Sequence, residues 1–251
     1  MSNNENYLSK LNVINAIPDE AIQLPGLPVG IYLQECENLY QWALEDADKL
    51  AAIGVSKADL DDLPVRAGAC REAQSLWMKN FRSQQNAQRQ WAVQLPEAYA
   101  LRNDLLRAMR YAFRNDNVLL GRVNSIANGS SNADMIQDLN DISVLGNENL
   151  APLAVLGITS EKLTEAATRS DNLARLLANV NDEKSRLGEY KITRDKAYTH
   201  LKQLVDELYA AGKYLFRNDK ERIKGYRISY WKKRKSARKA KATDETDSTE
   251  L

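Results

Sequence analysis

The chain has 251 residues, of which 43% are hydrophobic and 27% are charged, as in an ordinary soluble globular protein with one large domain or two modules. No stretch approaches the roughly 18–20 consecutive apolar residues of a membrane-spanning helix, and residues 1–10 lack the apolar centre of a secretory signal. Few Gly and Pro among many Ala, Leu, Lys, Arg, Glu and Gln favour helix over strand. We therefore expect an all-α, cytoplasmic protein.

Residues 1–30 differ from the rest of the chain because they hold half of its six prolines. These are Pro18, Pro25 and Pro28. Because a residue before proline avoids the helical region, this spacing predicts an extended N-terminal arm. The arm would lie across the helices through Ile22, Leu24 and Leu27.

Residues 31–126 have the pattern of three helices. Apolar residues recur at three- and four-residue spacing from Leu33 to Leu50, which indicates an amphipathic helix. Gly54 supplies the left-handed residue that ends a helix. A long second helix comes next, and Pro96 is expected to open a third, because proline fits a first helical turn but not an interior.

The chain repeats itself at an offset of 103 residues. "YAFRND" and "YLFRND" lie at this offset, and residues 101–123 share eight identities with residues 204–226. A separate block, LAAIGVSKADL, matches LAVLGITSEKL at the same offset. Two blocks at one offset, with no gap between them, indicate a tandem duplication of a unit of roughly 100 residues.

The second copy, residues 134–225, comes after a polar linker at 127–133. Gly157 repeats the role of Gly54, and Thr193 is the expected cap of the third helix. The predicted fold is therefore all-α, with two copies of a three-helix unit forming antiparallel helical bundles.

The shared letters Phe-Arg-Asn-Asp have a structural explanation at the end of a helix. Phe would be buried in the last turn, and Arg would offset the negative helix end. Asn would take the left-handed conformation, and Asp would cap the next short helix. We favour this explanation over a pair of ligand sites. The residues are Phe113, Arg114, Asn115 and Asp116 in the first copy and Phe216, Arg217, Asn218 and Asp219 in the second.

Arg66 and Arg169 occupy the same position in the two copies. Either arginine could tie its helix to Asp116 or Asp219 of the same copy, and an anion site is the functional alternative. With Gly54 and Gly157, these arginines complete the candidate structural residues of the repeat.

Charge is concentrated near the C-terminus. Residues 220–241 contain eleven Lys or Arg and one Glu, and the last ten residues carry four acids. Such a basic segment can neutralise phosphates, and aromatic side chains beside it can stack on unpaired bases. It can equally be a solvated tail, pack the last helix onto the body, or dock on acidic groups of a protein or a membrane surface. The candidate binding residues are Tyr226, Arg227, Tyr230, Trp231, Lys232, Lys233, Arg234, Lys235, Arg238 and Lys239, within a tail (226–251) that we predict to be largely disordered at its end.

Known catalytic and metal-binding motifs do not occur in the sequence. His200 is the only histidine, and we expect it to be exposed on a Lys- and Glu-rich helix. Cys36 and Cys70 lie on apolar stripes without CxxC spacing, so buried thiols are favoured over a disulfide. With no P-loop, GxGxxG or GxSxG either, we expect no cofactor and no metal.

Two classes of function remain. The first is a non-enzymatic structural or interaction protein, in which Trp77, Phe81 and Trp91 belong to the core or meet a partner protein or a second copy. The second is a nucleic-acid- or ribonucleoprotein-associated protein that binds through residues 220–241. An enzyme of unfamiliar type ranks third.

Overall fold

The computed structural model describes residues 1–230, and in this part of the chain it is all-helical, with eight α-helices, two short 3-10 helices and no strand. The elements are α1 (Asn3–Ala16), η1 (Asp19–Ala21), α2 (Val29–Glu45), α3 (Ala47–Ala51), α4 (Lys57–Ala112), α5 (Asn117–Ile126), α6 (Asn132–Glu148), α7 (Leu150–Ala154), α8 (Ser160–Leu215) and η2 (Arg222–Tyr226). The all-α prediction is confirmed. None of the described helices is both long and apolar enough to cross a membrane.

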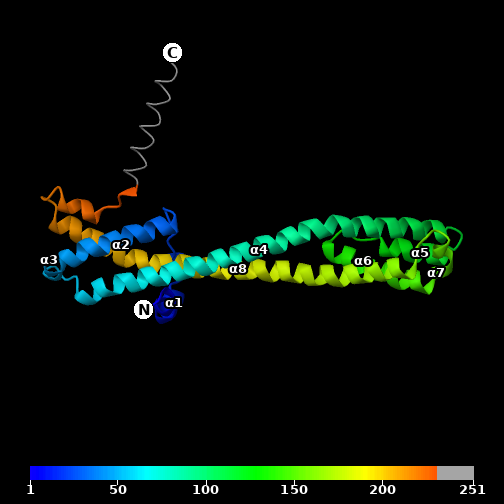
Figure 1. Ribbon diagram of the computed structural model, residues 1–251, viewed down its shortest axis with the longest axis horizontal. Helices are drawn as coiled ribbons and strands as arrows, with labels where there is room; N and C mark the ends of the chain where they lie inside the picture. Colours follow the sequence, from blue (N-terminus) through cyan, green and yellow to red (C-terminus); the bar gives the residue numbers. More distant parts are fainter. Residues whose placement is uncertain (231–251) are drawn as a thin grey trace, which may run out of the picture. The chain divides into compact units, whose positions relative to one another are not determined.

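The chain forms two compact units, each with its own apolar core. Unit 1 contains residues 1–79 and the described residues from Gly188 onward, and unit 2 contains residues 80–187. Both α4 and α8 contribute to both units, since each is a continuous helix of 56 residues (Figure 1). Each compact unit therefore takes residues from both predicted repeats, so the unit boundaries do not coincide with the repeat boundaries.

The core of unit 1 lies between α2, the first part of α4 and the last part of α8. Helix spacing on these three elements turns one apolar stripe of each toward the others. Its fully or nearly fully buried members include Leu33, Cys36, Leu39, Leu60, Leu63, Cys70, Leu201, Leu204 and Leu208. Ile14 of α1 joins this core with no exposed surface.

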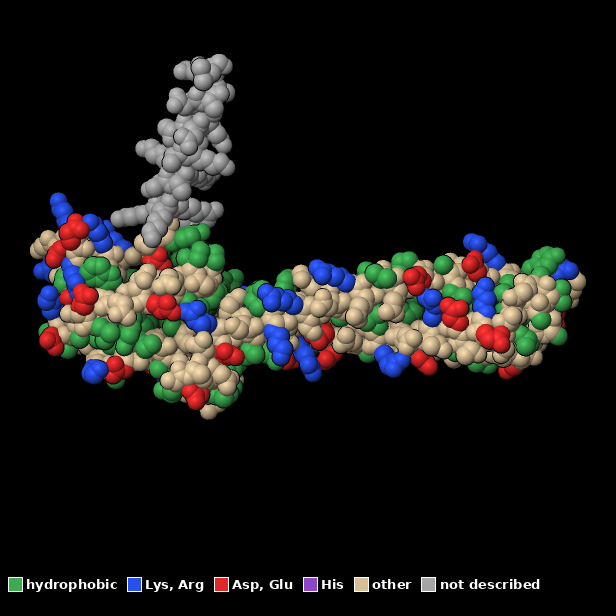
Figure 2. Space-filling model, in the orientation of Figure 1, with side chains coloured by type: hydrophobic (Ala, Val, Ile, Leu, Met, Phe, Trp, Pro, Cys, Tyr) green, Lys and Arg blue, Asp and Glu red, His purple; other side chains and the backbone are tan. Residues whose placement is uncertain are grey.

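The core of unit 2 lies between the last part of α4, α5, α6 and the first part of α8. Its members include Leu105, Met109, Phe113, Val123, Leu139, Ile142, Leu163 and Leu173. α5 and α6 pack against each other in this unit, and Val123 is the residue of α5 that is buried completely. On the face shown in Figure 2, acidic and basic side chains intermingle over the described residues.

The third helix predicted to begin at Pro96 does not exist, because α4 continues through this proline. Pro96 is exposed, while Leu95 packs against the core and Ala98 is fully buried. Burial of the apolar stripe on both sides offsets the backbone hydrogen bond that proline cannot make. Thr193 likewise lies inside α8, where its hydroxyl donates to the carbonyl of Glu189 (3.0 Å) instead of capping a helix.

The predicted extended arm is wrong where α1 forms. Ser2 and Glu5 make a reciprocal capping box, in which the Ser2 hydroxyl accepts from the Glu5 N–H (3.2 Å) and the Glu5 carboxylate accepts from the Ser2 N–H (2.6 Å). Beyond α1, Ile17 and Ile22 have extended backbone, and Leu27 is buried as expected. Leu24 is 69% exposed, so it does not help to hold the segment.

The two glycine corners have the predicted conformation. Gly54 has φ +94° and Gly157 has φ +75°, both in the left-handed region. In each corner the next amide closes the helix end, donating to the carbonyl five residues earlier: Val55 to Leu50 and Ile158 to Leu153, both at 3.1 Å.

Candidate functional site

The first Tyr-x-Phe-Arg-Asn-Asp stretch ends α4 and starts α5. Phe113 is 3% exposed, and the Arg114 guanidinium donates to the Tyr111 carbonyl at 2.8 Å while lying 4.4 Å from the centre of the Tyr111 ring. One carboxylate oxygen of Asp116 accepts hydrogen bonds from the amides two and three residues later, both at 3.0 Å. Arg114 thus satisfies a carbonyl at the helix end and Asp116 caps α5, as the sequence predicted.

The second stretch has the same geometry at the end of α8. Phe216 is 6% exposed, and Arg217 donates to the Tyr214 carbonyl at 2.9 Å with its guanidinium 5.2 Å from that ring. Asp219 accepts from the amides two and three residues later, at 3.0 and 2.8 Å. These backbone hydrogen bonds hold the pKa of the Asp219 carboxyl below its ordinary value.

The asparagines of these stretches do not take the left-handed conformation. Among the described residues, only glycines have positive φ, so the prediction for Asn115 and Asn218 is wrong. Each helix ends through a tighter bond, in which the Asp amide donates to the Phe carbonyl three residues earlier (2.9 and 3.0 Å). A negative φ suffices for that turn.

The segment after α8 is fastened to α2 within unit 1. The Arg222 guanidinium binds Asp46 at 2.6 Å and Glu45 at 2.8 Å, and it lies 4.6 Å from the ring of Trp42. The hydroxyl of Tyr226 donates to the same Asp46 carboxylate at 2.9 Å. Asp46 is 3% exposed and breaks the predicted single helix into α2 and α3. One buried carboxylate thus has both a guanidinium and a hydroxyl as partners.

Tyr226 has no exposed surface and stacks on Phe216 with 5.4 Å between ring centres. A Cβ on Gly212 would lie 1.9 Å from the Tyr226 ring, so only glycine allows this close approach. Burial raises the pKa of the Tyr226 hydroxyl above its ordinary value. Because it is enclosed, this ring offers no face to a nucleic-acid base.

The other candidate binding residues are placed differently. Arg227 is exposed and Tyr230 is half-buried against the core of unit 1, while Ser229 between them binds the Glu35 carboxylate through its amide (3.1 Å) and hydroxyl (2.7 Å). Trp231, Lys232, Lys233, Arg234, Lys235, Arg238 and Lys239 lie outside the described residues. Within the described part, residues 220–230 therefore form a docked segment.

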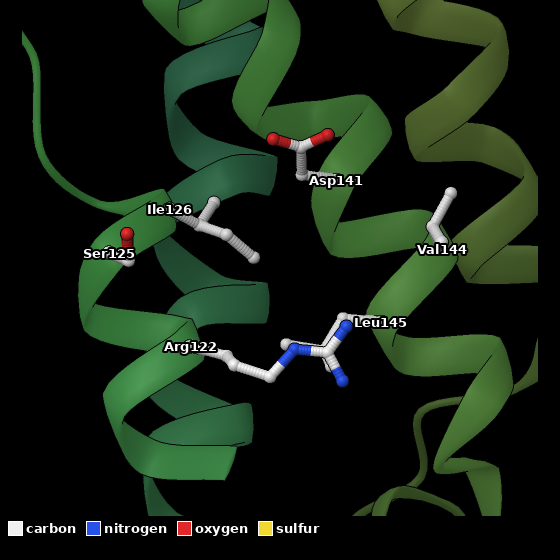
Figure 3. A pocket seen from close by; sticks show the side chains of 6 residues that line it. All are labelled: Arg122, Ser125, Ile126, Asp141, Val144 and Leu145. Atoms are coloured by element: carbon white, nitrogen blue, oxygen red, sulfur yellow. The ribbon is translucent and has the colours of Figure 1, made fainter. Parts of the chain in front are cut away.

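A surface groove of about 320 Å³ lies between α5 and α6 in unit 2 (Figure 3). It is lined by Arg122, Ser125, Ile126, Asp141, Val144 and Leu145. Leu145 is buried and Ile126 half-buried, whereas Val144 is 51% exposed. The groove thus joins an apolar floor to polar groups of both charges.

A second groove of about 240 Å³ lies between α2 and the docked segment in unit 1. Its lining includes Asn38, Gln41, Trp42, Gly225 and Ser229, which lie 103 positions from Asp141, Val144, Leu145, Arg122 and Ile126 in the other groove. Here Trp42 stands at the position of Leu145, between the Arg222 guanidinium and the backbone of Gly225.

Arg66 and Arg169 make equivalent contacts, but not the predicted ones. Arg66 binds Asp62 at 2.7 Å and donates to the carbonyl of residue 200 at 2.9 Å. Arg169 binds Glu165 at 3.1 Å and Glu97 at 3.0 Å. Neither arginine reaches the capping Asp of its own predicted copy, and carboxylates already neutralise both guanidinium groups.

His200 is 6% exposed, so the prediction of an exposed histidine is wrong. Its backbone carbonyl accepts from Arg66, and its Nε2 is buried without a hydrogen-bond partner in the described structure. Burial lowers the pKa of His200 to about 4, and the positive charge of Arg66 acts in the same direction. The imidazole is therefore neutral at physiological pH.

The remaining candidates belong largely to the cores. Cys36 and Cys70 are buried free thiols, and burial raises the pKa of Cys70 to about 12. Trp77 is half-buried under the Arg194 guanidinium (4.4 Å), and Trp91 packs against the core of unit 2. Phe81 is also half-buried. Across residues 1–230, no three His, Cys, Asp or Glu side chains gather into a metal-binding group.

Sequence reasoning missed both grooves, because they form where the end of one predicted copy meets the first helix of the other. The sequence signal that could have indicated them is the 103-residue offset. It also aligns the segments after Asp116 and Asp219, although these segments share little identity. The chain matches no protein-family model, no curated protein and no solved structure.

Proposed function

We propose that this chain is a non-enzymatic helical interaction protein built from two copies of one unit. The bounds of α6, α7 and α8 lie 103 positions after those of α2, α3 and α4, at both ends of each helix. Agreement of all six helix ends at one offset supports duplication more strongly than the shared sequence letters alone.

The contacts of the paired arginines support the same proposal. Residue 66 meets residue 200 in unit 1, and residue 169 meets residue 97 in unit 2. Position 169 lies 103 after 66, and position 200 lies 103 after 97. The same contact between α4 and α8 therefore occurs in both units. In unit 1 the arginine comes from the first copy, and in unit 2 it comes from the second, as expected if both copies contribute one long helix to each unit.

The observation that carries the interaction function is the pair of grooves. Five lining positions of the groove in unit 2 correspond, at the 103-residue offset, to lining positions in unit 1. Duplication of a binding surface would place a groove at the same position in both units, and the side chains that line the two grooves could then diverge. In contrast, the described His, Cys and paired Arg groups are used in packing and internal ion pairs.

Partner capture tests this proposal. Tagged full-length protein would be cross-linked in cells that produce it, and the captured proteins identified by mass spectrometry. We expect Val144→Lys to lose partners that the wild type captures, because a buried lysine opposes an apolar contact. Val155→Lys is the matched control, since Val155 is 86% exposed and does not line this groove. Identical capture by both variants and the wild type would contradict the proposal.

Binding of a polyanion is the second candidate function, and a difference between the copies favours it. Positions Lys220, Lys224 and Arg227 in the docked segment correspond to the uncharged Asn117, Gly121 and Asn124. With residues 231–241 they make this terminus basic only in the second copy. The test is fluorescence anisotropy with single-stranded RNA at several salt concentrations. We expect salt-sensitive binding that is lost when the chain ends at Tyr230, and undiminished binding by that shortened chain would exclude residues 231–241 as the site.

A further inference from the structure

Two exposed valines lie at the groove of unit 2 or one helical turn from a residue that lines it. Val144 is 51% exposed, and Val118 on α5 is 74% exposed, one turn before Arg122. The corresponding residues of unit 1 are Gln41 and Glu221, both exposed. Valine also favours an exposed helix less than Gln or Glu does. Since polar residues occupy the corresponding positions in unit 1, packing inside the chain does not explain these valines.

The same groove carries unlike charges that do not pair with each other in the described structure. Figure 3 shows Arg122 extending from α5 toward Leu145, while Asp141 lies on α6 one turn before Leu145. Arg122 approaches Glu148 at 3.5 Å, with both side chains more than half exposed (55% and 52%), and Asp141 accepts from Gln137 at 2.7 Å. Exposed contacts of this kind contribute little to stability, so both charges remain available to a partner.

We propose that this groove binds the same groove of a second copy in a two-fold dimer, an inference that rests on the proposed interaction function. A two-fold interface must be self-complementary, because the same patch meets itself with its ends exchanged. Asp141, Val144 and Glu148 succeed one another along one side of α6, and Arg122 lies beside Glu148. A two-fold axis near Val144 places Arg122 against Asp141 of the partner subunit and the two valines together.

The groove of unit 1 lacks what this contact needs. Asn38 and Gln41 stand at the positions of Asp141 and Val144, so neither a carboxylate nor a valine occupies those positions. The acidic residue that lines this groove, Glu35, accepts hydrogen bonds from Ser229. Trp42, at the position of Leu145, packs against the Arg222 guanidinium (4.6 Å) and Gly225. The dimer contact therefore belongs to unit 2 alone.

Charge exchange on the full-length protein tests the dimer. Sedimentation equilibrium across the micromolar range should show a dimer for the wild type. Arg122→Glu and Asp141→Arg should each weaken it at least about tenfold, since each places like charges together twice. An equimolar mixture of these two variants should restore dimers, because the two introduced side chains carry opposite charges and would then face each other across the interface. The double variant should dimerise on its own for the same reason.

Controls separate this proposal from general effects of surface charge. Gln41→Lys alters the corresponding position of unit 1 and should leave dimerisation unchanged, whereas Val144→Lys should weaken it at least about tenfold. Circular dichroism checks that each variant remains helical. A monomeric wild type, or variants whose mixture fails to associate, would overturn the dimer. Loss of the dimer with retained, Val144-dependent capture of another protein would leave the interaction function standing.

Discussion

The hydroxyl of Tyr226 donates a hydrogen bond to Asp46, which lies 180 positions earlier in the chain, at 2.9 Å. Asp46 is 3% exposed and also binds Arg222 at 2.6 Å. Asp46, between α2 and α3, therefore holds both ends of η2 through one buried carboxylate. This contact fastens part of the basic segment, residues 220–241, to the end of α2.

Replacement of Tyr226 by Phe should lower the free energy of unfolding by about 1–2 kcal/mol, because it removes a hydroxyl donor from a buried carboxylate while keeping the ring. Tyr214→Phe is the control, since Tyr214 is 62% exposed. Urea unfolding followed by circular dichroism measures both. Equal stability of the two variants would show that the hydrogen bond to Asp46 does not contribute.

The corner glycines should be sensitive to any side chain. Gly54→Ala and Gly157→Ala should each cost about 1–2 kcal/mol of unfolding free energy, because their positive φ values place a Cβ in a strained position. Gly188→Ala provides the opposite control. This glycine is exposed inside α8 with open space around it, so alanine should stabilise the helix by about 0.5–1 kcal/mol. Thermal denaturation distinguishes the two signs.

The capping aspartates should matter more than the asparagines beside them. Asp116→Ala should cost about 0.5–2 kcal/mol, because two amides at the start of α5 lose their acceptor. Asn115→Ala should change stability by less than about 0.5 kcal/mol, since Asn115 is exposed and its φ is negative. The pair Asp219→Ala and Asn218→Ala repeats the comparison in unit 1. A larger loss of unfolding free energy in the asparagine variants than in the aspartate variants would contradict this expectation and favour a left-handed helix end.

Protonation of His200 should make the protein less stable in acid. Its pKa is lowered to about 4 in the folded protein from the ordinary value of 6.5. Between these values the unfolded chain binds the proton and the folded chain does not, so unfolding becomes easier as pH falls. This contribution is fully present above about pH 6.5 and is lost progressively as the pH falls toward about 4.

Urea unfolding at about pH 7 and about pH 5 measures this effect. The charged groups near the imidazole are Arg66, Asp62 and Lys10. His200→Gln should therefore reduce the loss of stability between the two conditions. The same loss in the variant and the wild type would assign the acid sensitivity to other groups.

Local sequence signals predicted the features that depend on neighbours in the chain. Gly54 and Gly157 adopt left-handed backbone, Asp116 and Asp219 cap the short helical segments after them, and Phe113 is buried, because each role needs a particular side chain within a few residues. Where these signals compete with packing they fail. Pro96 marks a helix start in isolation, yet α4 passes through it because the core of unit 2 continues on both sides.

The candidate site was less predictable than the fold. Arg122 and Asp141 lie 19 positions apart on different helices, and nothing in their local sequence indicates that they border one groove. Tyr226 has an aromatic ring of the kind that stacks on bases, but Phe216 and Gly212 pack against that ring. Burial of a side chain depends on segments far away in the chain, and periodicity in one segment does not contain that information.

The sequence by itself determined that the chain is helical, where its glycine corners lie and which residues cap its short segments. Those properties arise from backbone conformation and hydrogen bonds within a few residues, so composition and spacing encode them. Only the tertiary structure decided that α4 and α8 are continuous, that His200 is buried and that Asp46 holds Tyr226. These depend on which apolar stripes meet, and the free energy of that burial outweighs local preferences such as those of proline and histidine.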